Sequence, residues 1–136
     1  MTTVRRLLPA RLLHDRRGVA TVEFAFATIL LVMFMVGILE FGRALWTQNV
    51  LGFAVEQAGR YVIAYPAAAD DDIKGYVATQ LHNVDVSAVT VTVARDTAGG
   101  VNYVTVTART PFTSVAPFVE SALLNLSSSS RVPIGT

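Results

Sequence analysis

The sequence predicts an α+β fold in which one long N-terminal helix packs against a small antiparallel sheet and a short second helix. Two observations support this fold class. Residues 19–65 contain no proline and begin with an apolar run. Residues 89–93 and 104–107 alternate valine with threonine, with the period of two that is typical of half-buried strands.

The apolar run covers residues 19–39, and Glu23 is its only charged residue. A helix of this length measures about 31 Å, which matches the hydrocarbon thickness of a bilayer. A chain of 136 residues is too small to bury such a helix on all sides, so we interpret the run as a transmembrane helix. No proline follows it before Pro66, and we therefore expect the helix to continue outside the membrane through residues 40–65.

Charge is distributed unevenly about the apolar run. Residues 1–17 carry a net charge of +4, whereas the rest of the chain sums to −3. Because basic residues next to a membrane helix favour the cytoplasmic side, residues 1–18 are expected in the cytoplasm and the C-terminal part outside. A secretory signal peptide has a similar outline, but this run is long for one, and the nearest small-residue cleavage site, Gly42–Ala44, is poor.

The composition excludes several classes of protein. Hydrophobic residues make up 52% of the chain and charged residues 15%, which is unlike a disordered chain. With no cysteine, the chain has no disulfide framework, no thiolate metal site and no cysteine nucleophile.

The sequence contains little that resembles an active site. His82, Asp85 and Ser87 are the one close group that could suggest a catalytic triad, but no nucleophile elbow surrounds the serine. No phosphate-binding loop, dinucleotide motif or metal-ligand pair is present either. We therefore expect no enzyme, no cofactor or metal, and neither a nucleic acid nor a small-molecule substrate as partner.

A glycine and a glutamate mark the start of the apolar run. If the chain were cut after Gly18, Val19 would become the N-terminus and Glu23 the fifth residue. Glycine leaves the peptide unobstructed and flexible for a protease. A carboxylate in a membrane costs about 2.5–3.5 kcal/mol at the centre and less near an interface, so Glu23 is either tolerated at the interface or paired. The freed ammonium of Val19 in a neighbouring subunit would be a suitable partner, and it would set the axial register.

This arrangement resembles the class III signal of type IV pilin-like proteins. In that group a prepilin peptidase removes a basic leader on the cytoplasmic side of the membrane, and the apolar helix then serves in assembly. The residues that the resemblance implicates are Arg16 and Arg17 of the leader, Gly18 and Val19 at the cleavage site, and Glu23 and Phe24 in assembly and register.

Three segments narrow the resemblance: Gly18–Ala25, Glu40–Arg43 and Ala54–Tyr61 are similar to TadE-like proteins, which are minor pilins or pseudopilins of the tight-adherence (Flp-type) pilus system. Cleavage would leave 118 residues, whereas the major pilin of that system is little more than its helix. Phe24 also stands where the major pilin usually has tyrosine. These differences favour an accessory subunit.

The resemblance implies a single-pass protein of the bacterial inner membrane, with a cytoplasmic N-terminus and a periplasmic or extracellular domain that could enter the pilus. Its partners would be a prepilin peptidase, other pilin-like subunits and the pilus assembly machinery. Two alternatives stay open. The chain could be an uncleaved, signal-anchored extracytoplasmic binding domain, or a pseudopilin of a type II secretion system.

The exported segment, residues 66–136, is expected to fold as a small α+β domain on the second half of the long helix. The helix residues that would face this domain form an apolar stripe: Leu51, Val55, Ala58 and Val62. Closer to the membrane, Glu40 and Arg43 are spaced to form a surface pair, and Trp46 is expected to be an interfacial anchor.

Turn and cap signals set the remaining elements. Asp70–Asp72 predict the N-cap and acidic first turn of a short helix, and a calcium site is the less favoured alternative because no spaced oxygen-ligand pattern follows. Asp96–Gly100 predicts the hairpin loop between the alternating strands, which Val84–Val86 would extend at the start and Pro111 would end. The C-terminal part predicts a short helix within residues 117–126, a flexible connector at Ser127–Ser130 and an edge strand at Arg131–Ile134.

Overall fold

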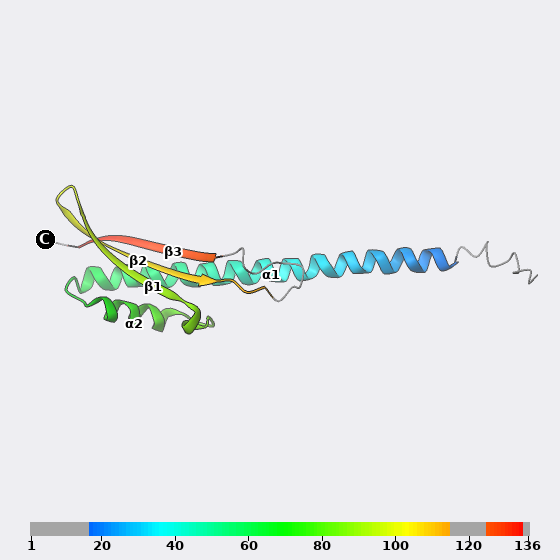
Figure 1. Ribbon diagram of the computed structural model, residues 1–136, viewed down its shortest axis with the longest axis horizontal. Coiled ribbons are helices and arrows are strands. Elements are labelled where there is room, and N and C mark those ends of the chain that lie inside the picture. The colour runs from blue at the N-terminus through cyan, green and yellow to red at the C-terminus, as the bar shows by residue number, and fades with distance from the viewer. Residues whose placement is uncertain (1–16, 115–124, 135–136) are drawn as a thin grey trace, which may run out of the picture. The chain divides into compact units, whose positions relative to one another are not determined.

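Figure 1 shows the computed structural model, which describes residues 17–114 and 125–134. Its first element, α1, is a single helix from Arg17 to Ala64, as the proline-free region predicts. The helix ends two residues before Pro66, which cannot continue it. The chain divides into two compact units between Ile38 and Leu39, and each unit is described by itself.

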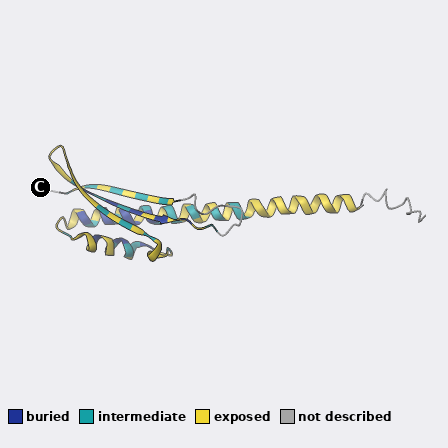
Figure 2. Cartoon of the chain, in the orientation of Figure 1, coloured by how far each residue is buried: buried dark blue, intermediate teal, exposed yellow. Residues whose placement is uncertain are grey.

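The N-terminal unit contains the first part of α1. Every residue from Gly18 to Met35 is exposed, and this part of the helix is yellow in Figure 2. The exposed side chains are apolar on all sides of the helix; Phe24, for example, is 74% exposed. Because an apolar helix of this kind needs apolar surroundings, and because α1 is long and apolar enough to cross a membrane, the unit has the character of a membrane anchor.

In the second unit, α1 has one buried face. The predicted stripe of Leu51, Val55, Ala58 and Val62 is buried, with each residue at most 1% exposed. Figure 2 shows this face in dark blue between exposed stretches of the same helix. The stripe is the centre of the hydrophobic core, so the prediction that the domain packs on the second half of the helix is confirmed.

Helix α2, Asp70–Gln80, packs beside α1 and adds Ile73 and Val77 to the core. Its three aspartates lie in the first turn, as predicted, where the helix dipole favours negative charge. The predicted N-cap is wrong, because the cap residue is Ala69 and no side chain forms a capping hydrogen bond. The helix begins one residue earlier than an aspartate cap requires, which places all three carboxylates inside the helix.

Three strands form an antiparallel sheet in the order β1-β2-β3, with the bounds β1 Thr90–Ala98, β2 Val101–Pro111 and β3 Asn125–Ile134. The central strand buries Val104, Val106 and Ala108 against the helices and turns its threonines Thr105 and Thr107 outward. The predicted alternation is therefore confirmed. Together the elements make the predicted α+β, pilin-like fold, with a long helix, a short second helix and a small antiparallel sheet.

The β1–β2 hairpin is tighter than predicted. Thr97 and Ala98 still pair with β2, so only Gly99 and Gly100 form the turn. Both glycines have positive φ, +60° and +79°, a conformation that a two-residue hairpin requires and that glycine adopts without strain. The predicted extension of β1 over Val84–Val86 is wrong, because Val86–Ala88 forms a 3-10 turn that Asp85 caps.

The serines of the C-terminal region are also not a flexible connector. Ser127–Ser130 pair with β2 along their whole length and belong to the same strand as the predicted edge segment Arg131–Ile134. Serine suits this position because Ser130 packs on Gly59, where an added Cβ would lie 2.8 Å from the serine Oγ. Leu126 also lies in β3, and the remainder of the predicted helix, residues 117–124, lies outside the described residues.

Candidate functional site: the start of α1 and the junction beyond it

The first turns of α1 contain most of the residues that the sequence analysis implicated. Gly18 and Val19 are in the first turn, one and two residues after Arg17 begins the helix. Glu23 and Phe24 follow one turn later, and both are exposed. Arg16 lies outside the described residues.

Glu23 shares one helix face with the proposed cleavage site. Gly18, Val19, Val22, Glu23 and Phe26 line an open hollow of about 630 Å³. Residues four and seven positions apart lie on the same side of a helix, so the side chain of Glu23 is displayed next to Val19 and among apolar groups. A cation from another molecule could approach the carboxylate from this side.

The proposed cleavage site is helical, which bears on how a protease would bind it. The first four N–H groups of an α-helix have no partner within the helix, so unwinding Gly18 and Val19 breaks few hydrogen bonds. Gly18 also weakens the helix locally, by about 1 kcal/mol relative to alanine. The first turn contains no acidic residue that would stabilise it through the helix dipole. The end of α1 is therefore easy to open into an extended strand.

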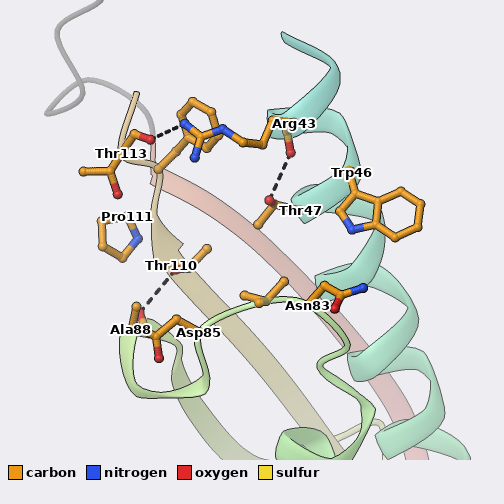
Figure 3. A pocket seen from close by; sticks show the side chains of 11 residues that line it. Arg43, Trp46, Thr47, Asn83, Asp85, Ala88, Thr110, Pro111 and Thr113 are labelled. Carbon is orange, nitrogen blue, oxygen red and sulfur yellow. Dashed lines mark hydrogen bonds between the residues drawn. The ribbon is translucent and has the colours of Figure 1, made fainter. Parts of the chain in front are cut away.

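A second group of interactions surrounds Arg43, shown in Figure 3. The predicted pair is present, with Arg43 Nη2 2.8 Å from Glu40 Oε2. The same nitrogen donates a hydrogen bond to the carbonyl of Thr113, and the guanidinium lies 4.6 Å from the ring centroid of Phe112. Arg43 thus links α1 to the segment after β2. Nothing in the sequence pattern indicates these contacts, because they join residues about 70 positions apart.

A cavity of about 270 Å³ lies beside Arg43, between α1, the connection that follows α2 and the end of β2. Trp46 borders it and is 58% exposed. On the opposite side the wall includes Asn83 and Asp85, and Asn83 has a positive φ of 59°. The cavity lies within the second unit, and the α1 residues that line it are four to eight residues after the end of the apolar run.

The three residues that could suggest a catalytic triad make other contacts. Ser87 donates hydrogen bonds to Asp85 from its hydroxyl, at 2.7 Å, and from its backbone N–H, at 3.0 Å. Both bonds stabilise the ionised form of Asp85, so its pKa is lowered, and the hydroxyl of Ser87 makes the larger contribution. His82 Nδ1 lies 2.9 Å from the carbonyl oxygen of Gln80. Asp85 and Ser87 therefore act as a local cap of the 3-10 turn.

The acidic first turn of α2 is engaged by basic side chains. Arg95 donates to Asp70 at 3.1 Å and also to the carbonyl of Ala68 at 2.8 Å, while Lys74 pairs with Asp71 at 3.0 Å. Within residues 17–114 and 125–134, no three His, Asp or Glu side chains form a group that could hold a metal ion. These contacts agree with the preferred interpretation of the aspartates as first-turn residues.

The outer face of α1 in the second unit carries large apolar side chains. Leu45, Trp46, Phe53 and Ile63 are between 49% and 58% exposed and lie outside the buried stripe on the helix. Glu56 and Arg60 are the charged residues among them. An exposed apolar helix face of this kind is characteristic of an interaction surface.

Comparison with known proteins identifies one similar family. Residues 18–60 match the family model described as TadE-like protein. No curated protein and no solved structure matches the chain. The match covers the start of α1, the Glu40–Arg43 pair and most of the buried stripe, and it confirms the predicted resemblance of this segment to TadE-like proteins.

Proposed function

We propose that this chain is an accessory pilin-like subunit of a tight-adherence pilus, and that a prepilin peptidase activates it by cutting between Gly18 and Val19. The observation that carries the proposal is the family match, because it begins at Gly18 itself and continues through the helix that would remain after the cut. The same match supports a structural role in pilus assembly rather than catalysis.

The proposed parts of the chain have different tasks. Residues 1–18 are a basic leader that stays in the cytoplasm, with Arg16 and Arg17 next to the cut. Residues 19–39 hold the protein in the inner membrane. Residues 40–65 continue the helix outside it, and residues 66–136 form the periplasmic or extracellular domain. The apolar character of residues 18–35 and the excess of basic residues before them support this division.

Cleavage would create an ion-pair partner for Glu23. The new α-ammonium of Val19 would stand at the end of α1, one turn from its own Glu23 and free to reach the Glu23 of a neighbouring subunit. The hollow lined by Val19, Glu23 and Phe26 is open to such an approach. In apolar surroundings a pair of opposite charges attracts strongly and leaves each charge costly when unpaired, so the pair would fix the axial register of adjacent helices.

The exposed apolar face of α1 supports the same assembly outside the membrane. Phe53 and Ile63 belong to this face, and they offer a neighbouring helix a contact surface that continues along the chain from the apolar run. Other pilin-like subunits, and the machinery that extracts and stacks them, are the proposed partners.

N-terminal mass spectrometry of the protein from its native host tests the proposal. With an active peptidase the expected chain begins at Val19, and with the peptidase gene deleted it begins at Met1. A Gly18→Leu variant should remain uncut in both strains, whereas Gly37→Leu, a matched change within α1, should be cut normally. A chain that starts at Met1 while the peptidase is active would instead favour a permanently anchored binding domain.

Glu23→Ala tests the register role separately. The variant should insert and be cut as usual, since neither step uses the carboxylate, but piliation should be lost or strongly reduced. Glu23→Gln, which keeps the size of the side chain and removes the charge, should give the same defect. Normal piliation in both variants would contradict the proposed ion pair while leaving the cleavage result intact.

A further inference from the structure

The sheet has two edge strands, and each has an uncharged, proline-free stretch at the same level of the sheet. Within the described residues, β1 and β3 are the edge strands. Their uncharged, proline-free stretches, Thr90–Ala94 and Ser127–Ser130, occupy the same rows of the sheet, because Thr92 and Ser129 both pair with Thr107. The charged residues and Pro133 lie together toward the other end of the edges. Charges and prolines are the usual protection of sheet edges, so each strand has an unprotected stretch at the same level.

The β3 edge also borders a groove that would admit another strand. A cavity of about 560 Å³ lies between β3 and the outer side of α1, lined by Asn49, Gly52, Phe53, Val55, Glu56 and Ser128–Ser130. The serines are part of the unprotected stretch of β3. A sheet edge with a helix along one side is the geometry in which proteins bind an extended segment by strand addition.

Each edge strand of the sheet has a different helix beside it. α2 packs next to β1, while α1 lies against β3, where Gly52 faces Ser128 and Gly59 faces Ser130. A neighbour that placed its β1 along β3 would therefore also bring its α2 toward the outer face of α1. The helix layer and the sheet layer would then continue together from one copy to the next.

The positions of two charged groups, the acidic first turn of α2 and Arg60 of α1, also favour this side-by-side arrangement. Asp70 in the first turn of α2 bonds to Arg95, and Arg95 shares its row of the sheet with Val132, which lies against Gly59. The acidic turn of α2 is therefore level with Arg60, on the opposite side of the domain. Among the described residues, neither Arg60 nor Asp72 forms an ion pair, and both are exposed.

We propose that a second copy of this chain docks side by side with the first, adding its β1 to the free edge of β3 and placing Asp72 of its α2 near Arg60. Both strands run antiparallel to β2, so copies in the same orientation pair them in parallel. The contact joins two different surfaces and does not close on itself, so it generates an open array. It rests on the proposed function in one respect, which is that neighbouring copies stand in the same membrane with the same orientation.

Cysteine cross-linking in the native membrane tests the contact, and the absence of native cysteines removes any background. Thr92→Cys and Ser129→Cys would be adjacent across the proposed contact, at about 5 Å between Cα atoms. Within one copy they are two strands apart, roughly 10 Å, which is too far for a disulfide. The double variant should therefore form an oxidation-dependent ladder of dimers and larger oligomers.

Control variants test the register and the location of the proposed contact. Each single variant should stay monomeric, as should Thr92→Cys combined with Asn125→Cys, because residue 125 lies about 13 Å further along β3. Asn49→Trp fills the groove from an exposed position of α1 and should abolish the ladder. Thr105→Trp, which introduces the same side chain on the outer face of β2, should not. Arg60→Asp should weaken the ladder, and adding Asp72→Arg should restore it.

Other outcomes would overturn the proposal. Dimers of Ser129→Cys alone would mean a symmetric contact between two β3 edges, and a cross-link from either cysteine to a different protein would mean a different occupant. Monomers throughout, with Thr105→Trp accumulating normally, would mean that copies do not meet at these edges. The N-terminal mass of the cross-linked species is read in the same experiment, so a failure of leader cleavage is recognised separately from a failure of the edge contact.

Discussion

The two parts of α1 share one backbone and differ in what surrounds them. From Gly18 to Met35 the helix is exposed on every side, although its residues are almost all apolar. From Leu51 to Val62 one side of the helix is an apolar stripe, and that stripe is fully buried. The comparison shows that apolar content alone does not make a core. The second part belongs to a folded domain because its apolar residues form a stripe that matching strands can cover.

The largest difference is expected when the same substitution is made in each part. Leu51→Ala removes a side chain that is 0% exposed and should lower the free energy of unfolding of the domain by about 2–5 kcal/mol. Leu31→Ala, at a residue that is 60% exposed, should change it by no more than about 0.5 kcal/mol. Denaturation of the full chain in detergent, followed by near-ultraviolet circular dichroism, measures both. Equal effects would mean that the two parts of α1 are not independent.

Two helix glycines provide a smaller and more specific test. Gly59→Ala introduces a Cβ that would meet Ser130 Oγ at 2.8 Å and Val132 Cγ1 at 3.0 Å, and overpacking of this kind costs about 1–3 kcal/mol. Gly75→Ala, in α2, meets nothing within 4 Å and should stabilise the domain by about 1 kcal/mol. Opposite shifts in the melting temperature are expected, and a stabilising Gly59→Ala would contradict the close packing of β3 on α1.

Arg43 lies near the border of the two parts of α1, and its substitution should have a moderate effect on the stability of the domain. Arg43→Ala removes the bond to the Thr113 carbonyl and the contact with the Phe112 ring and should cost about 1–2 kcal/mol. Arg60→Ala, an exposed arginine of the same helix without an ion pair among the described residues, should be nearly neutral. Chemical denaturation of the two variants compares them. A neutral Arg43→Ala would mean that the contacts of Arg43 with Thr113 and Phe112 contribute little to the stability of the domain.

The smallest expected effect concerns Asp85 and pH. Because the Ser87 hydrogen bonds lower the pKa of this carboxyl in the folded protein, the stability that it contributes is present above the pKa of the unfolded chain. That stability is lost as the pH falls through the lower folded value. In Ser87→Ala the pKa of Asp85, followed by NMR titration, should rise toward its ordinary value, and the stability difference from the wild type should vanish in acid. An unchanged titration would mean that Ser87 does not hold the carboxylate.

The elements that could be predicted from the sequence are those encoded by neighbouring residues. The run of residues 19–39, the stripe from Leu51 to Val62 and the valine–threonine alternation each repeat with the period of the structure they form. The TadE-like segment could be recognised for the same reason, since its glycine, glutamate and apolar helix lie within a short stretch.

The mispredicted serine segment depends on residues far away in the chain. Ser127–Ser130 have a weak preference for strands, and they form one because β2 supplies hydrogen bonds on one side and Gly52 and Gly59 leave room for them against α1. The predicted extension of β1 over Val84–Val86 failed for a local reason, because Asp85 and Ser87 close a turn over Val86–Ala88. Local pattern therefore determined the long helix, its apolar run and the alternation of the strands. Only the tertiary structure decided that the serine segment completes the sheet, because strand pairing and close packing depend on partners that no local pattern reveals.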